Sequence, residues 1–342
     1  MVKLVLTEDE TMLADSARGF LDKSAPVKAF RDLRDAGQTH DAAGILAQEM
    51  GKTLAVSPFL STAVIAATAL RHVSDARAEA ALAKIASGDA TYALAVDETS
   101  KFNPDATAMT ATAEGNGFRL TGKKTFVVDG TLADRLLVLA KTDNGLTLFD
   151  IPADRAGITR NAQNMIDARD SARIDFDNVE ATGDDVLGQV DDAMTVLKPA
   201  IKAGQAALAA EMAGVAAGAF GMTVGYLKER KQFGTLIGTF QALQHRAAHL
   251  WCETEVTASA VLHAGRKLDE DPDNATMAVS LAKARATSTA KLAVIEGVQM
   301  HGGIGMTDAF DMGFYMKRAR VGAEWLGDYG YHAAQVAKHR GF

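Results

Sequence analysis

The chain has 342 residues, a net charge of −7 and a single cysteine, Cys252. One cysteine excludes an internal disulfide and a cysteine-rich zinc or iron–sulfur site, and a mildly acidic chain without a basic block is a poor nucleic-acid binder. No apolar run approaches the length of a membrane-spanning helix, about 18 residues, and the first residues lack a signal-peptide core, so we expect a cytoplasmic protein. The length of the chain predicts two or three packed units.

The beginning of the chain has the spacing of helices. Thr7 and Glu10 are placed as in a capping box, and the apolar residues that follow recur at helical intervals. The same spacing continues over residues 41–56 and 59–88. We therefore predict an N-terminal helical domain over residues 1–90.

The pattern changes over residues 91–187. Short runs rich in Val, Thr, Leu and Phe alternate there with Gly, Asn and Asp at intervals of about ten residues. This pattern predicts a middle antiparallel β domain, a sandwich or a barrel. No long helix separates these runs, so a dinucleotide-binding βαβ unit is not expected.

From residue 188 to residue 342 the apolar spacing is helical again. Four long helices with apolar faces predict a C-terminal four-helix bundle. Their expected ranges are 191–230, 240–268, 274–300 and 310–338. The predicted fold class is thus α+β, mainly α, with a helical domain, a β domain and a helical bundle in that order.

Metal-ligand patterns in the chain are incomplete. His245 and His249 lie four residues apart, as in a zinc pair, but Arg246 stands where a metalloprotease needs glutamate, and no third ligand is evident. The aspartates around residue 271 lack the glycine and the closing glutamate of a calcium loop. A surface histidine pair and a solvated turn between helices are the simpler interpretations, so no metal site is predicted.

The first segment with a chemical signal is residues 229–250. Arg230 stands at the end of an apolar helix, and the flexible Gly234 follows before the next helix begins. A planar guanidinium in this position can pair with a phosphate. A plain corner between two helices would explain the same residues without a ligand.

The second segment is residues 297–307. Gly302, Gly303 and Gly305 would let backbone amides approach a ligand closely, and Gln299 supplies a neutral amide nearby. Here too a helix corner is the alternative, because glycine is common where helices end.

In this order, the two segments resemble the C-terminal half of the acyl-CoA dehydrogenase family. The family's patterns there are approximately R-x-x-F-G-x-x-[IL]-x-x-x-Q and Q-x-x-G-G-x-G-[FY]. In this chain the matching residues are Arg230, Phe233, Gly234, Ile237 and Gln241, then Gln299, Gly302, Gly303 and Gly305, with Met306 at the aromatic position. The order of helices, strands and helices is also the family's.

The resemblance implies an FAD-dependent enzyme that converts an acyl-CoA thioester to a 2-enoyl-CoA, with a carboxylate as the base that removes the α-proton. It also implies that one FAD lies across two subunits. The β domain of one subunit then holds the isoalloxazine, and a neighbour holds the pyrophosphate and adenosine. The implied cofactor-binding residues of this chain are Arg230, Phe233, Gln241, Gln299, Gly302 and Gly303.

The β domain departs from the family's pattern. The family's T-E-P-x-x-G-S-D loop survives only in fragments around Asp97 and Glu98. The strand K-x-[WF]-I-[TS]-N-[GA] begins here at Lys124, and Val128 occupies the hydroxyl position. Because valine cannot hydrogen-bond a flavin ring, we expect an eroded isoalloxazine half-site.

The catalytic base is also missing from both positions that the family uses. Aligning Gly327 with the family's glycine puts Leu326 at one base position, and the other falls near Gly204–Gln205. The carboxylates left as reserve candidates are Glu324 and Asp328, with Glu211 about two helical turns beyond the second position. We therefore assign no catalytic residue to this chain.

These departures favour a subunit that works with a larger acyl-CoA dehydrogenase subunit, in an α2β2 tetramer with two FAD, in lipid or steroid catabolism. A self-sufficient homo-oligomer with a noncanonical base and a flavin-free structural subunit are the alternatives. The expected joining surface is the long C-terminal helices, whose alanine- and glycine-rich faces permit close packing: Ala209, Ala213, Ala216, Ala217 and Gly221.

Overall fold

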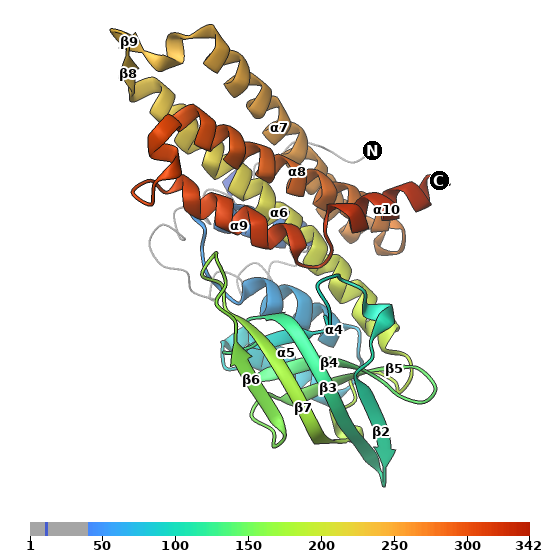
Figure 1. Cartoon of the computed structure of the whole chain (residues 1–342). Helices are drawn as coiled ribbons and strands as arrows, with labels where there is room; N and C mark the ends of the chain where they lie inside the picture. Colours follow the sequence, from blue (N-terminus) through green and yellow to red (C-terminus); the bar gives the residue numbers. More distant parts are fainter. Residues whose placement is uncertain (1–10, 13–39) are drawn as a thin grey trace. The chain divides into compact units, whose positions relative to one another are not determined.

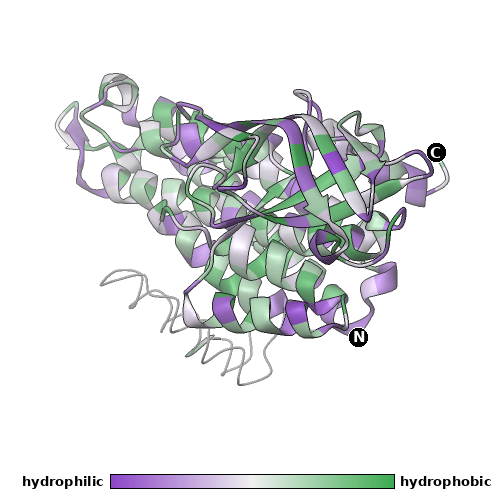
Figure 2. Ribbon diagram, turned by 90° about the horizontal axis from the view of Figure 1, so that it is seen from below, coloured by the Kyte–Doolittle hydropathy of each residue, from purple (hydrophilic) through white to green (hydrophobic). Residues whose placement is uncertain are grey.

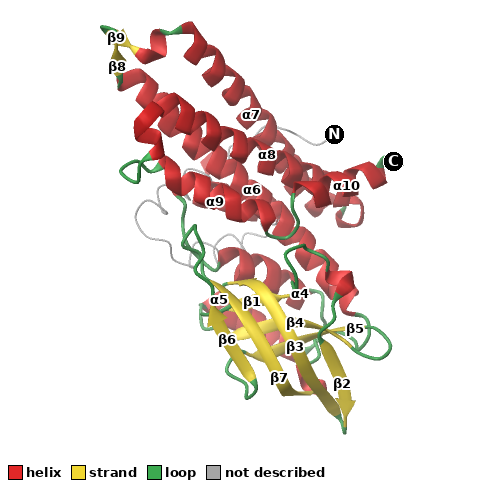
Figure 3. Cartoon of the chain, viewed as in Figure 1, coloured by secondary structure: helices red, strands yellow, loops and turns green. Residues whose placement is uncertain are grey.

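The computed structural model describes residues 11–12 and 40–342, which form two compact units (Figure 1). The helical unit contains Met1–Ala55 and Gln205–Phe342, and the β unit contains Val56–Gly204. The predicted capping box at Thr7 and Glu10 lies outside the described residues. The predicted α+β, mainly α fold is confirmed, with helices before and after a sheet (Figure 3).

Long helices make up the described part of the helical unit. They are α3 (His40–Thr53), the part of α6 (Ala193–Glu229) from Gln205 onward, α7 (Gln241–Glu270), α8 (Thr276–His301), α9 (Met312–Glu324) and α10 (Tyr329–His339). Helix α8 packs against α7, α9 and α10, and α3 packs against α7. The apolar spacing in the sequence placed the first three C-terminal helices within two residues of their observed bounds.

The fourth predicted helix, residues 310–338, is wrong as a single element. Helix α9 ends at Glu324, and Leu326 and Gly327 have φ angles of 56° and 105°. A helix cannot continue through left-handed residues, so the chain turns there and α10 begins at Tyr329.

Helices α3 and α6 cross at two glycines. A Cβ on Gly51 would lie 2.0 Å from the carbonyl oxygen of Glu211, and one on Gly214 would lie 1.9 Å from that of Gln48. Only glycine allows the two backbones to approach so closely.

The small-residue face of α6 is therefore used largely inside the chain. Ala209, Ala213 and Ala216 are buried in the helical unit, while Ala217 is half-buried and Gly221 is exposed. The expectation that Ala209, Ala213 and Ala216 join another subunit is wrong, because these three alanines already pack within this chain. That the long C-terminal helices join the subunits stays a prediction.

Helix α6 also corrects the expectation that no run approaches a membrane-spanning length. By length and composition α6 could cross a membrane, but 67% of its apolar window is buried inside the protein. A core helix passes the same test, and burial of most of the window is the pattern that a core helix shows.

A seven-stranded sheet forms most of the β unit, in the order β1-β4-β2-β3-β7-β6 with β5 paired to β4. The strands are β1 (Tyr92–Ala95), β2 (Thr110–Glu114), β3 (Gly117–Val128), β4 (Arg135–Lys141), β5 (Leu146–Pro152), β6 (Ile158–Ala162) and β7 (Ser171–Thr182). Most pairings are antiparallel, as predicted, but β4 runs parallel to both β1 and β2. Apolar and polar segments both occur along the strands (Figure 2).

Short helices precede the sheet in the same unit. They are a π-helical segment Phe59–Ala66, α4 (Ala67–Arg71) and α5 (Ala76–Ser87). The Thr62 hydroxyl donates to the carbonyl of Tyr92 at 3.2 Å and accepts from its amide at 2.9 Å. These bonds fix the π-helical segment to strand β1, so residues 56–87 belong to the β unit rather than to a separate helical body.

Candidate functional site

Arg230 stands at the junction between α6 and a short hairpin. Its amide donates to the carbonyl of Tyr226 at 2.9 Å, and its carbonyl accepts from the amide of Ile237 at 2.9 Å. The backbone of Arg230 is thus held from both sides. Its side chain is exposed, and the guanidinium forms no hydrogen bond or ion pair with any residue in the described part of the chain. An unpaired guanidinium can take an anionic ligand without losing an existing partner.

The hairpin after Arg230 presents an aromatic side chain at its tip. Strands β8 (Lys231–Gln232) and β9 (Thr235–Leu236) pair antiparallel, and Phe233 and Gly234 form the turn with φ angles of 54° and 80°. The Phe233 side chain is 93% exposed, and its ring meets that of Phe240 edge to face at 6.1 Å between centroids. An exposed aromatic pair at a tight turn is available for contact with a ligand or a neighbouring chain.

The remaining candidates lie at helix ends. Gln241 is the first residue of α7, and Gln299 lies in the last turn of α8; both are exposed. Gly302 ends α8 with a φ of 65°, and neither Gly302 nor Gly303 has any atom near the place where a Cβ would lie. The backbone at these two glycines is therefore open to an incoming group.

Gly305 has a different role from its two neighbours. It is buried, and a Cβ there would lie 2.9 Å from both the Cβ of His301 and the carbonyl oxygen of Val298. The turn Gly302–Met306 therefore folds back against the last turn of α8, and this third glycine is explained by packing rather than by a ligand.

The two motif segments lie at the same end of the helical unit, as the contacts among three aromatic rings show. The centroids of Tyr226 and His301 are 4.5 Å apart, those of His301 and Phe310 are 4.5 Å apart, and those of Tyr226 and Phe310 are 6.0 Å apart. Tyr226 lies one turn before Arg230, and His301 directly precedes Gly302. None of these three residues was predicted from the sequence, although His301 lies inside the second segment and Tyr226 and Phe310 lie three residues outside the two segments.

The two parts of FAD need different residues around them, so each unit can be compared with the part that the resemblance assigns to it. In the helical unit, the unpaired Arg230, the open glycines and the exposed amide side chains suit a diphosphate and a nucleotide. In the β unit, Val128 is buried and offers no donor, and Asp97 Oδ1 is buried with no hydrogen-bond partner. Burial raises the pKa of Asp97 to about 7.

Lys124 of the β unit already binds two oxygens of the segment that contains Asp97. Lys124 is fully buried, and its Nζ donates to Glu98 Oε1 at 2.7 Å and to the Val96 carbonyl at 3.1 Å. Because the side chain is fully buried and binds these two oxygens, it presents no donor at the surface for a flavin ring. The helical unit fits the nucleotide part of FAD, and the β unit does not fit the isoalloxazine.

The two positions where the family places a base meet in this chain. Gln205 Nε2 donates to the carbonyl of Leu326 at 2.9 Å, and His332 Nε2 donates to the same oxygen at 3.1 Å. The buried Lys283 Nζ donates to the carbonyls of Gly322 at 2.9 Å and Gly327 at 3.3 Å. Gln205, His332 and Lys283 thus hold the turn between α9 and α10 by donating to its carbonyls. Neither of the two base positions carries a carboxylate.

Each reserve carboxylate near this turn has a structural partner. Glu211 pairs with the buried Arg318 at 3.1 Å, and Glu324 pairs with Arg320 at 2.8 Å. Asp328 accepts from the amide of Tyr331 at 2.8 Å and so begins α10. These contacts account for the carboxylates without a catalytic role.

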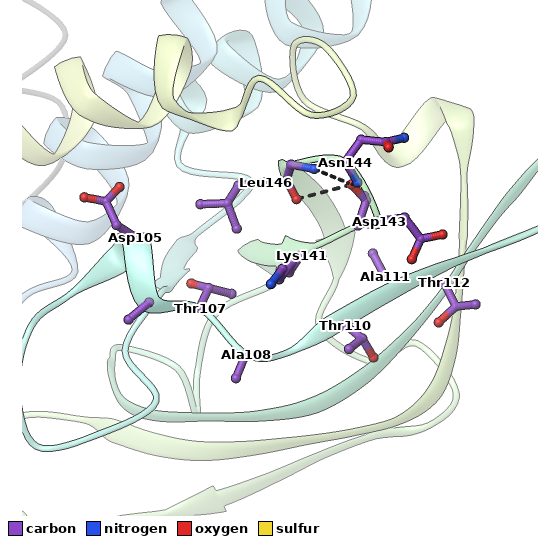
Figure 4. A pocket seen from close by; sticks show the side chains of 13 residues that line it. Asp105, Thr107, Ala108, Thr110, Ala111, Thr112, Lys141, Asp143, Asn144 and Leu146 are labelled. Carbon is purple, nitrogen blue, oxygen red and sulfur yellow. Dashed lines mark hydrogen bonds between the residues drawn. The ribbon is translucent and has the colours of Figure 1, made fainter.

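A further pocket of about 870 Å³ lies in the β unit, between β2 and the turn that joins β4 to β5 (Figure 4). Its lining includes Asp105, Thr110, Lys141 and Asp143, and none of the six cofactor-binding candidates belongs to it. In the part of the chain that the structure describes, no three His, Cys, Asp or Glu side chains gather to hold a metal ion.

Comparison with known proteins identifies the family. A family model described as acyl-CoA dehydrogenase, C-terminal domain, matches residues 193–340. The acyl-CoA dehydrogenase IpdE2 of Mycobacterium tuberculosis is 34% identical over 290 residues, which cover 85% of this chain and 74% of that protein. The solved Tcur3481–Tcur3483 steroid ACAD superposes with a TM-score of 0.85 at 27% identity, covering 98% of each chain.

The match to longer relatives is partial. The short/branched chain specific acyl-CoA dehydrogenase of Bos taurus mitochondria is 29% identical over 242 residues, which are 67% of this chain. The chain spans about half the length of that relative, 54%. With the IpdE2 match and the order of its helices and strands, the chain belongs to the acyl-CoA dehydrogenase family.

Proposed function

We propose that the chain is a subunit of an FAD-dependent acyl-CoA dehydrogenase and supplies the nucleotide half of an FAD site to a larger catalytic subunit. The observation that carries this proposal is that two features lie at one end of the helical unit. They are the Arg230 guanidinium, which has no partner in the described part of the chain, and the open Gly302–Gly303 turn. Tyr226 and His301 connect the two through a ring contact of 4.5 Å.

The roles of the chain's own residues follow from their chemistry. Arg230 would neutralise the diphosphate, the amides at Gly302 and Gly303 would donate to it, and Phe233 would pack on the nucleotide. Bound FAD supplies a hydride acceptor at the β-carbon of the acyl-CoA. The base that removes the α-proton would come from the partner, since Leu326 and Gln205 cannot accept a proton.

The partner is proposed because one chain leaves the cofactor incompletely held. Asp97 and Val128 make the β unit of this chain a poor isoalloxazine site, so a homo-oligomer would have nucleotide half-sites with no matching flavin half-site. The similar Tcur3481–Tcur3483 steroid ACAD is named as a pair of chains. This supports an α2β2 assembly with two FAD and a bulky, steroid-like acyl-CoA as substrate.

Arg230→Ala tests the proposal in the chain co-expressed with the larger acyl-CoA dehydrogenase subunit that completes the complex. A charge-assisted contact contributes about 1.5–3 kcal/mol, so FAD affinity should fall about tenfold to a hundredfold. Lys231→Ala is the matched control, because it removes a neighbouring exposed cation at a position that the motif leaves unspecified. Unchanged FAD affinity in Arg230→Ala would refute the nucleotide role.

A further inference from the structure

His301 is a buried polar residue of the second motif segment, and its ring contacts Tyr226 of the helix that leads into the first. Its side chain lies at the end of α8, directly before the open Gly302, and is 3% exposed. We propose that His301 is a positioning residue, which holds the Gly302–Gly303 turn at a fixed place relative to Arg230. The inference rests on the proposed function, that these two segments hold the nucleotide half of FAD.

The hydrogen bond of the ring fixes its tautomer. His301 Nδ1 lies 2.6 Å from the carbonyl oxygen of Gly297, which can only accept, so Nδ1 carries the proton. Nε2 is then a bare acceptor, and it is buried with no hydrogen-bond partner. The ring is thus anchored at one nitrogen to the preceding helical turn and cannot rotate without losing that bond.

The His301 ring contacts two other parts of the chain. Tyr226 comes from the last turn of α6 and Phe310 from the segment after the glycine turn, and each centroid lies 4.5 Å from that of His301. The carbonyl of Tyr226 accepts from the amide of Arg230. A short chain of contacts therefore runs from Arg230 through Tyr226 and His301 to Gly302.

The turn beyond His301 is shaped around the same residue. A Cβ on Gly305 would lie 2.9 Å from the Cβ of His301, so glycine at 305 lets the turn fold back directly onto His301. The open glycines stand between these two packed points. Their backbone amides are therefore held in one geometry. A ligand that binds there does not have to order a loop, which would weaken its binding.

Two variants separate the ring contact from the hydrogen bond. His301→Phe keeps a ring in contact with Tyr226 and Phe310 but loses the bond to Gly297, and His301→Asn keeps a donor for Gly297 but loses the ring. Apo complexes would be titrated with FAD and with FMN, which lacks the adenosine monophosphate part. We expect each variant to weaken FAD binding about fivefold to tenfold and to leave FMN affinity as in the native complex.

The control is His249→Asn, because His249 is an exposed histidine of α7 that is not among the six cofactor-binding candidates and does not contact His301. Equal weakening of FAD and FMN would show a general structural role and would overturn the proposal, as would unchanged FAD affinity in both variants. If His301→Phe does not fold, the His301→Asn titration decides alone. Arg230→Ala separates the two claims: if it loses FAD affinity while both His301 variants keep it, only the positioning role fails.

Discussion

The side-chain amide of Gln205 donates a hydrogen bond of 2.9 Å to the carbonyl oxygen of Leu326. These are the two places where acyl-CoA dehydrogenases carry their base by the resemblance drawn from the sequence, and in this chain they lie in direct contact. Both residues are buried, and neither can take up a proton. In place of a base, the two positions share a hydrogen bond that fixes the turn between α9 and α10.

This contact predicts that no carboxylate near the turn is needed for turnover. Glu324→Gln and Asp328→Asn should each leave the rate of the assembled enzyme nearly unchanged, and asparagine should still begin α10 because it is a good N-cap. Loss of a general base typically costs about 10²–10⁴-fold. A steady-state assay at matched FAD content checks this, and a loss of that size in either variant would place the base in this chain.

The helix ranges show how far the sequence determined this structure. Apolar spacing placed α6 at 191–230, and the helix runs over Ala193–Glu229, because periodicity reports which residues face a core. The break at Leu326 was missed, since a left-handed leucine leaves no mark in composition. The contact between Tyr226 and His301 was missed as well, because spacing within a segment does not identify its partner in space.

The assembly prediction concerns the number of flavins. Co-expressed with a complete subunit, the chain should form an α2β2 tetramer with two FAD, because in the proposed function the partner's β domain holds the isoalloxazine. Expressed alone, it should aggregate or remain poorly soluble, since a large obligate interface would be exposed. Native mass spectrometry reads both results directly. A soluble homotetramer that holds four flavins and oxidises an acyl-CoA would favour the self-sufficient alternative.

The crossing of α3 and α6 predicts a sharp difference between two glycines of one helix. In Gly214→Ala the new Cβ would meet the carbonyl oxygen of Gln48, so the helices must separate and the free energy of unfolding should fall by about 1–3 kcal/mol. Gly221→Ala is the control, because nothing lies within 4 Å of its Cβ position and alanine favours a helix by up to about 1 kcal/mol. Chemical denaturation measures both, and a Gly214→Ala variant as stable as the native chain would refute the close crossing.

The turn after α9 predicts acid sensitivity through His332. Burial, followed by the nearby Lys283, lowers the pKa of His332 to about 3, while the unfolded chain has the ordinary value of about 6.5. Between these values the unfolded chain binds a proton that the folded chain does not. The free energy of unfolding should therefore fall as the pH drops below 6.5, by up to about 1.4 kcal/mol per pH unit.

His332→Gln isolates this contribution, because a glutamine amide can still donate to the Leu326 carbonyl but does not titrate. Burial lowers the pKa of Lys283 to about 7, below its unfolded value, so its own contribution to the pH dependence falls mainly above pH 7. Urea denaturation at pH 6 and pH 5 should show a smaller loss of stability in His332→Gln than in the native chain. His249→Gln, which changes an exposed histidine, should keep the native pH dependence. Equal losses in the native chain and His332→Gln would show that His332 is not held neutral in the fold.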